Sequence, residues 1–224
     1  MLDIYKYYNT YPNNEGLAFN PMVSGCFCKK SYLRVLNTTD IPLDFQVNEI
    51  LMSENLNTGE FTKYIKLLPG TYHVKIHKAN GNGKILFESD IDIDYNLSYT
   101  GVISMDDDIF VLMVPEEKEN YSSHLMSVLR LANLSLDAPD AILSTTDGTI
   151  LFSGIKYGNV SCNVAIPSGR YDMSLKTKDN KNILDLKMDL APRMHYTLFI
   201  TGKQKDGNIK IIIPEDGVNY LDLC

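Results

Sequence analysis

The chain has 224 residues, of which 44% are hydrophobic and 22% are charged, and its net charge is −7. These proportions are typical of a folded globular protein, and the length suits one large domain or two moderate ones. The acidic charge argues against nucleic acid or an anionic membrane as the main partner, because both require a positive surface. The sequence contains no run of about 18 apolar residues, so membrane insertion is not expected.

The N-terminus lacks the apolar stretch and the small-residue cleavage site of a Sec signal. We therefore expect a cytoplasmic protein, with a surface layer or a spore coat as the alternative. The four cysteines do not form a framework spread over the chain, as the disulfides of a secreted scaffold would.

Residues 1–30 form a Tyr-rich N-terminal arm that stands outside the rest of the pattern. Its rings either pack on a domain, serve interaction or cross-linking, or belong to a disordered segment. One residue separates its two cysteines, where zinc and redox motifs have two, so a disulfide or plain packing is favoured. The candidate interaction or cross-linking residues are Tyr5, Tyr7, Tyr8, Tyr11, Cys26, Cys28 and Cys224.

The first domain is predicted over residues 31–115 as short strands separated by turns. Tyr72, Val74 and Ile76 alternate with polar residues, which is typical of a half-buried strand. Pro69-Gly70 forms the preceding turn, because glycine supplies the φ freedom that a tight reversal needs. The strands expected in chain order cover residues 31–37, 62–68, 72–77, 84–94, 99–105 and 109–114.

A polar linker over residues 116–123 leads to a second domain over residues 124–224, which ends in a short C-terminal tail. The linker is too short to let two domains tumble freely. The second domain repeats the order of strands and turns of the first.

An internal repeat determines the predicted architecture. Residues 59–72 match residues 158–171 without a gap, and the last strands align so that Glu116 matches Glu215. Neither copy shows sustained helical periodicity, and turn residues recur every 8–12 positions. The sequence therefore predicts an all-β protein of two tandem β-sandwich domains preceded by the arm.

Turn and strand motifs in both copies carry a family resemblance. Arg34 precedes an Asp-Ile-Pro turn, Arg130 precedes an Asp-Ala-Pro turn, and Gly70-Thr71-Tyr72 follows a Gly-x-Phe-Thr-x-Tyr strand. In these motifs the chain resembles a bacterial family known as domain of unknown function 4397, whose members often carry the domain in tandem. The resemblance implies paired immunoglobulin-like or transthyretin-like sandwiches, frequently at a cell surface, and it implies no activity. Lys63 and Cys162 replace an aspartate of the family pattern.

We expect no metal or cofactor. His73 and His77 lie four residues apart on a strand, about 13 Å, which is too far for one zinc ion. Asp90, Asp92, Asp94 and Asn96 resemble the start of an EF-hand loop, but its glycine and glutamate positions hold other residues. They indicate an amphipathic strand instead, with a weak calcium site near Asp106-Asp107-Asp108 as the alternative.

Four tyrosines recur in both copies, and a feature found in both copies meets a structural demand. We interpret them as core anchors whose hydroxyls bond to nearby backbone; they are Tyr72, Tyr99, Tyr171 and Tyr196. Ser122-Ser123-His124 does not indicate a hydrolase, because no Gly-x-Ser-x-Gly elbow accompanies it.

The sequence favours a non-enzymatic binding or structural protein, with no catalytic residues, in a bacterial cell or spore surface layer. We expect a protein or glycan partner and self-association. The alternative is a hydrolase or carbohydrate-processing enzyme with a site in an inter-domain cleft, using Asp40, Asp137 and Arg130. Convergent carboxylates of perturbed pKa in an open cleft favour the enzyme, and a packed interface favours the binding module.

Overall fold

The computed structural model describes residues 30–81, 83–105, 108–116, 124–138 and 140–223. Its first half contains the strands β1 (Ser31–Asn37), β2 (Leu43–Val47), β3 (Ile50–Leu56), β4 (Ile65–Leu67), β5 (Gly70–Lys78), β6 (Ile85–Ile93), β7 (Ser98–Met105) and β8 (Ile109–Glu116). Its second half contains β9 (Met126–Asn133), β10 (Ile142–Thr145), β11 (Ile150–Phe152), β12 (Asn159–Val160), β13 (Val164–Pro167), β14 (Gly169–Lys176), β15 (Asn182–Leu190), β16 (His195–Thr201), β17 (Lys210–Ile212) and the 3-10 helix η1 (Gly217–Asn219).

Each half folds into two facing sheets with matching strand orders. The first half has the sheets β4-β1-β7-β8 and β3-β2-β5-β6, and the second half has β12-β9-β16-β17, with β13 also on β9, and β11-β10-β14-β15. In both halves the opening strand pairs in parallel with the penultimate one, β1 with β7 and β9 with β16, while the other ladders are antiparallel. The predicted all-β sandwich fold is confirmed.

The β2–β3 hairpin is an element that the sequence analysis missed. Leu43, Phe45 and Val47 on β2 are buried in the first core, and the two residues between them are partly exposed. This alternation is visible in the sequence and could have identified the strand. The strand predicted over residues 62–68 is shorter in the structure, where β4 covers Ile65–Leu67.

The recurring tyrosines have the role that the sequence predicts. The hydroxyls of Tyr72 and Tyr171 each donate at 2.7 Å to the backbone carbonyl four residues earlier. The hydroxyls of Tyr99 and Tyr196 each accept at 3.2 Å from the backbone N–H five residues earlier. These four bonds confirm that the tyrosines fix the same local geometry in both copies.

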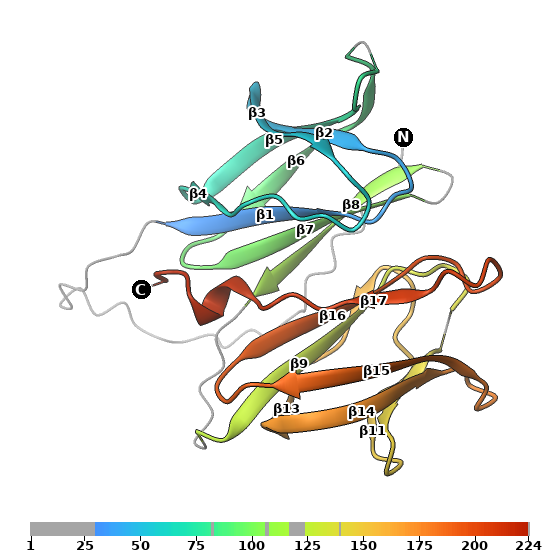
Figure 1. Ribbon diagram of the computed structural model, residues 1–224. Coiled ribbons are helices and arrows are strands. Elements are labelled where there is room, and N and C mark those ends of the chain that lie inside the picture. Colours follow the sequence, from blue (N-terminus) through green and yellow to red (C-terminus); the bar gives the residue numbers. More distant parts are fainter. Residues whose placement is uncertain (1–29, 82, 106–107, 117–123, 139, 224) are drawn as a thin grey trace, which may run out of the picture.

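The four sheets form a stack in which the two inner sheets face each other (Figure 1). We call the contact between sheets β4-β1-β7-β8 and β12-β9-β16-β17 the seam. A third apolar cluster fills it, with Leu36, Val102 and Val114 from the first half and Ala132, Leu134 and Phe199 from the second. The strands β1, β7, β9 and β16 are covered on both faces and are buried along nearly their whole length. They carry polar side chains among the apolar ones, and these polar groups are buried with the strands.

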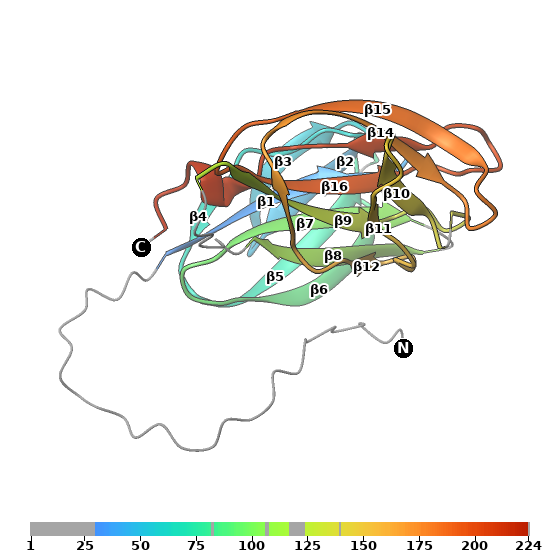
Figure 2. The ribbon, with the colours of Figure 1, turned by 90° about the horizontal axis from the view of Figure 1, so that it is seen from below.

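The C-terminal segment crosses the seam. Figure 2 shows η1 lying beside the start of β1 and near β4, which belong to the first half. The rings of Tyr64 and Tyr220 meet edge to face with centroids 6.1 Å apart, and Lys30 pairs with Asp222. The last residues of the chain therefore bind the two halves together.

Strand register corrects one sequence match. Ile103 pairs with Val111 on β8, and Ile200 pairs with Ile211 on β17, so β8 and β17 align one residue away from the expected register. Glu116 consequently corresponds to Asp216 and not to Glu215. Glu116 is also the last residue of β8 and is buried, whereas the sequence analysis assigned it to the polar linker.

Among the described residues, no helix has the length and apolar character that a membrane span needs.

Candidate functional site

The candidate cross-linking residues of the arm and the C-terminus lie outside the described residues. This applies to Tyr5, Tyr7, Tyr8, Tyr11, Cys26, Cys28 and Cys224. Their proposed role stays a prediction. Cys162 is described, and its thiol is free and exposed.

The two histidines of β5 have separate partners. His73 contacts Asp90 on β6 at 2.8 Å, and His77 contacts Gln46 on β2 at 3.1 Å. Within the part of the chain that the structure describes, no three His, Cys, Asp or Glu side chains come together as a metal site.

The aspartates of β6 lie on its outer face. Asp90 and Asp92 are exposed, while Ile91 and Ile93 point into the core, as expected for an amphipathic strand. Asp106 and Asp107, together with Ser122 and Ser123, lie outside the described residues.

The three candidates for an inter-domain enzyme site lie in different environments. Asp40 is exposed in the turn after β1. Asp137 accepts hydrogen bonds from the backbone N–H groups of Gln204 and Lys205, at 2.7 and 3.0 Å. Arg130 is buried in the seam. Their described partners do not coincide, so the geometry does not assemble them into one site.

A buried group of charges lies in the seam, and its first half surrounds Glu116. The guanidinium of Arg34 contacts this carboxylate at 3.3 Å and donates to Thr100 at 2.8 Å, and the Thr100 hydroxyl donates to the carboxylate at 2.6 Å. Ser98 donates at 2.8 Å and Tyr64 at 2.9 Å. Glu116 is therefore a fully hydrogen-bonded carboxylate, as a buried charge requires.

The second half of the group repeats the arginine–threonine–carboxylate arrangement. Arg130 contacts Asp216 at 3.3 Å and donates to Thr197 at 2.8 Å, and Thr197 donates to Asp216 at 2.9 Å. Arg130 and Thr197 both donate to the same oxygen of Asp216, Oδ2. The other oxygen, Oδ1, is buried and has no hydrogen-bond partner among the described residues.

Two hydrogen bonds link these halves across the seam. The N–H of Gly217 donates to Glu116 at 2.6 Å, and Arg130 donates to the carbonyl of Pro115. The guanidinium of Arg34 also lies 4.7 Å from the centroids of the Phe61 ring and of the Tyr64 ring, within the range of a cation–π contact. The charges thus couple the two halves.

Electrostatics distinguish the two carboxylates and the tyrosine beside them. Burial raises the pKa of Asp216 to about 6, with Arg130 opposing and Glu116 adding to the shift. Burial likewise raises the pKa of the Tyr64 hydroxyl, and the neighbouring Glu116 charge adds to it. Tyr64 therefore stays a neutral donor, and Asp216 changes charge near pH 6.

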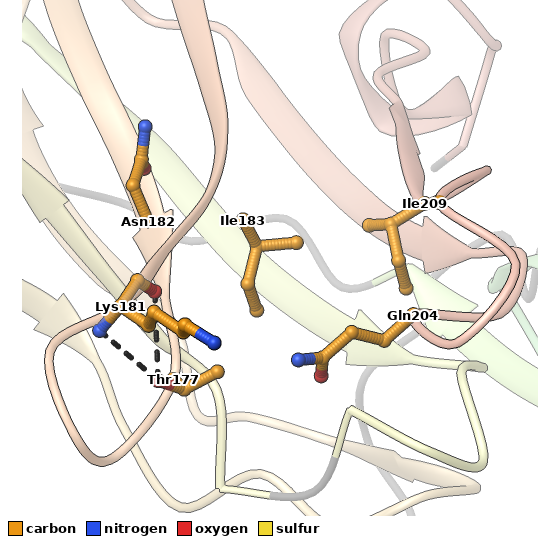
Figure 3. Close-up of a pocket in the computed structure, with 7 residues that line it drawn as sticks. Thr177, Lys181, Asn182, Ile183, Gln204 and Ile209 are labelled. Atoms are coloured by element: carbon orange, nitrogen blue, oxygen red, sulfur yellow. Dashed lines mark hydrogen bonds between the residues drawn. The ribbon is translucent and has the colours of Figure 1, made fainter.

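A polar cavity lies at one end of the second half, between the β14–β15 hairpin and the β16–β17 loop (Figure 3). Its volume is about 280 Å³. It is lined by Thr177, Lys181, Asn182, Ile183, Gln204, Gly207 and Ile209. A second cavity of about 310 Å³ in the first half is lined by Asp44, Glu54, Asn55, Ala79 and Asn80.

Sequence reasoning missed the residues that define both sites. Glu116 and Asp216 were hidden by the shifted register, and Lys181 and Gln204 lie in loops far apart in the sequence. One signal was present: each opening strand carries an arginine between apolar residues, Arg34 and Arg130, which predicts a buried carboxylate partner.

Comparisons with known proteins give a family and a distant likeness to a solved structure. A solved structure of the Bacillus anthracis TIE protein matches 78% of this chain and 34% of its own, with 12% sequence identity and a TM-score of 0.27. This chain therefore spans about a third of that protein's length. No curated protein matches the chain. The family model "Domain of unknown function (DUF4397)" matches residues 31–143 and 127–221, so the chain belongs to this family and carries its domain in tandem.

Proposed function

We propose that the chain is a non-enzymatic binding or structural protein whose two sandwiches act as one rigid block. The observation that carries the proposal is the seam, where apolar side chains and a hydrogen-bonded charge group fill the contact between the inner sheets. Since a buried ion pair contributes little net stability, we infer that these pairs serve to fix the relative position of the two inner sheets. A rigid pair of domains presents its loops and outer sheets at a constant spacing.

A position in a bacterial cell or spore surface layer is part of this proposal. The duplicated scaffold and the Tyr- and Cys-bearing arm support it, because such arms offer chemistry for cross-linking. The partner expected for the block is a protein or a glycan, and copies of the chain are expected to associate.

One observation favours the enzyme alternative. Asp216 has a raised pKa, and one of its oxygens in the seam has no hydrogen-bond partner among the described residues; both are features of catalytic carboxylates. Asp216 is 3% exposed, however, so a substrate could reach it only if the sheets separated. This geometry supports a structural role for the carboxylate.

The experiment measures the turnover of a panel of ester and glycoside substrates by two proteins, the unchanged full chain and its Asp216→Asn variant. We expect no turnover above that of buffer for either protein, and the same inter-domain orientation from residual dipolar couplings in both. Turnover by the full chain that the substitution abolishes, with the fold retained, would show that the seam is an active site. Two independently tumbling domains in the unchanged protein would refute the rigid block.

A further inference from the structure

The cavity of Figure 3 is built from loops that differ between the two copies. Residues 202–209 connect β16 to β17, whereas residues 106–108 connect the equivalent strands β7 and β8. The longer loop carries Lys203 and Lys205, and the shorter one is three consecutive aspartates. Features shared by both copies build the fold, so a loop that is longer in one copy is where we expect a specific role.

Backbone hydrogen bonds hold both walls of the cavity in place. The carboxylate of Asp137 accepts from the backbone N–H of Gln204 at 2.7 Å and fixes the β16–β17 loop. The hydroxyl of Thr177 accepts from the backbone N–H of Lys181 at 3.1 Å and fixes the β14–β15 hairpin. The site is therefore preorganised, which lowers the entropic cost of binding.

Two hydrogen-bond donors meet inside the cavity. Figure 3 shows the ammonium of Lys181 and the amide nitrogen of Gln204 pointing toward the same space from opposite walls, beside Ile183 and Ile209. The structure gives these two side-chain groups no acceptor among the described residues. Because Lys181 is exposed, a carboxylate or phosphate oxygen can reach this pair of donors and replace the water around them.

The lining of the cavity favours an anion, because Lys181 is the charged residue among the seven that form it. The two loops around the cavity also carry Lys176, Lys178, Lys203 and Lys205. Carboxylates balance these further lysines: Asp179 and Asp206 lie in the same loops, and Asp137, Asp140 and Asp185 lie beside them, with Asp140 4.0 Å from Lys178. The attraction for an anion therefore comes from the ammonium of Lys181 at the cavity wall.

We propose that this cavity binds the anionic group of a sugar polymer, with Lys181 and Gln204 holding a carboxylate or phosphate. The two isoleucines offer an apolar surface to the sugar ring, and the hydroxyl of Thr177 offers a polar atom to one of its hydroxyl groups. Peptides are commonly recognised along a free strand edge or an apolar groove, whereas this cavity lies between two loops. At about 280 Å³ it takes one sugar unit of a longer chain. The inference rests on the proposed binding role.

The test measures binding of the full chain to four polymers: polygalacturonate, phosphomannan, neutral dextran and polyglutamate. Binding to one or both anionic sugar polymers is expected, and the stronger of the two identifies the anion. Lys181→Glu is expected to weaken that binding by about tenfold or more, the effect of losing a charge-assisted hydrogen bond. Gln204→Ala is expected to weaken it by a smaller factor.

The matched control is Lys84→Glu, which makes the same charge change on the equivalent hairpin of the first half, where the side chain is exposed. It is expected to change the affinity by less than about twofold, since only the long-range field is altered. Thermal unfolding of each variant checks that the fold is intact. Three outcomes would each refute the proposed site. They are an equal loss of affinity from Lys84→Glu and Lys181→Glu, equal binding of dextran, and binding of polyglutamate as tight as that of the anionic sugar polymers.

Failure of this site and failure of the proposed function give different results. If no anionic sugar polymer binds and no substrate is turned over, this inference alone is wrong. If the chain cleaves a polymer and Asp216→Asn abolishes the cleavage, the proposed non-enzymatic role is wrong, whatever happens at Lys181.

Discussion

Replacing Asp216 by asparagine is expected to remove a pH-dependent part of the protein's stability. Burial raises the pKa of this carboxyl from its ordinary value of 3.8 to about 6, because its charged form is poorly solvated in the seam. The folded protein therefore binds this proton more tightly than the unfolded chain does. The stabilisation is fully present below about pH 4 and is lost as the pH rises through about 6.

The two pKa values give the magnitude. Between about pH 7.5 and about pH 5, a carboxyl with a pKa of about 6 when folded and 3.8 when unfolded adds about 1.4 kcal/mol to the free energy of unfolding. Asparagine has no proton to bind. The difference in stability between the unchanged protein and Asp216→Asn should therefore shift by this amount in favour of the unchanged protein as the pH falls.

Urea unfolding followed by circular dichroism at about pH 5, 6 and 7.5 measures this difference. The four histidines are common to both proteins, so their contribution cancels in the difference. Asp206→Asn, which makes the same substitution at an exposed carboxylate outside the seam, is the control with which the Asp216→Asn difference is compared. A flat difference for Asp216→Asn, or a shift of the opposite sign, would refute the buried and poorly paired state of this carboxylate.

Three further predictions concern packing and backbone. Phe199→Ala removes a fully buried ring from the seam and should lower the free energy of unfolding by about 3–5 kcal/mol. The control is Tyr95→Ala, at an exposed ring, which should change it by less than about 0.5 kcal/mol. Denaturant titration measures both values, and similar values would contradict a packed seam. Asn133→Ala removes the side-chain donor to the buried carbonyl of Ala138 and to the partly buried carbonyl of Ile155, and it should cost about 2 kcal/mol in the same titration; a neutral effect would argue against this anchor. Gly202 has a φ of +87°, and Gly202→Ala would place a methyl group 2.4 Å from the backbone oxygen of Asn208. We therefore expect calorimetry to give a lower melting temperature for this variant. An unchanged melting temperature would show that the β16–β17 loop can shift.

The sequence by itself determined the features that depend on local spacing. The repeat, the alternation of Tyr72, Val74 and Ile76, and the bonds of the recurring tyrosines involve positions a few residues apart, where strand geometry leaves few alternatives. The same reasoning identified the solvated face of β6 and separated His73 from His77. The hairpin of β2 and β3 was open to this reasoning as well.

Only the tertiary structure decided which faces of the sandwiches meet. A strand buried on both sides shows in the sequence as an apolar run, but the run does not identify the partner that covers its second face. Arg34 and Arg130 thus signal buried carboxylates without showing that these are Glu116 and Asp216, 82 and 86 residues further along the chain. The cavity of Lys181 and Gln204 was hidden for the same reason, because contacts between distant loops depend on how the strands that carry them pack.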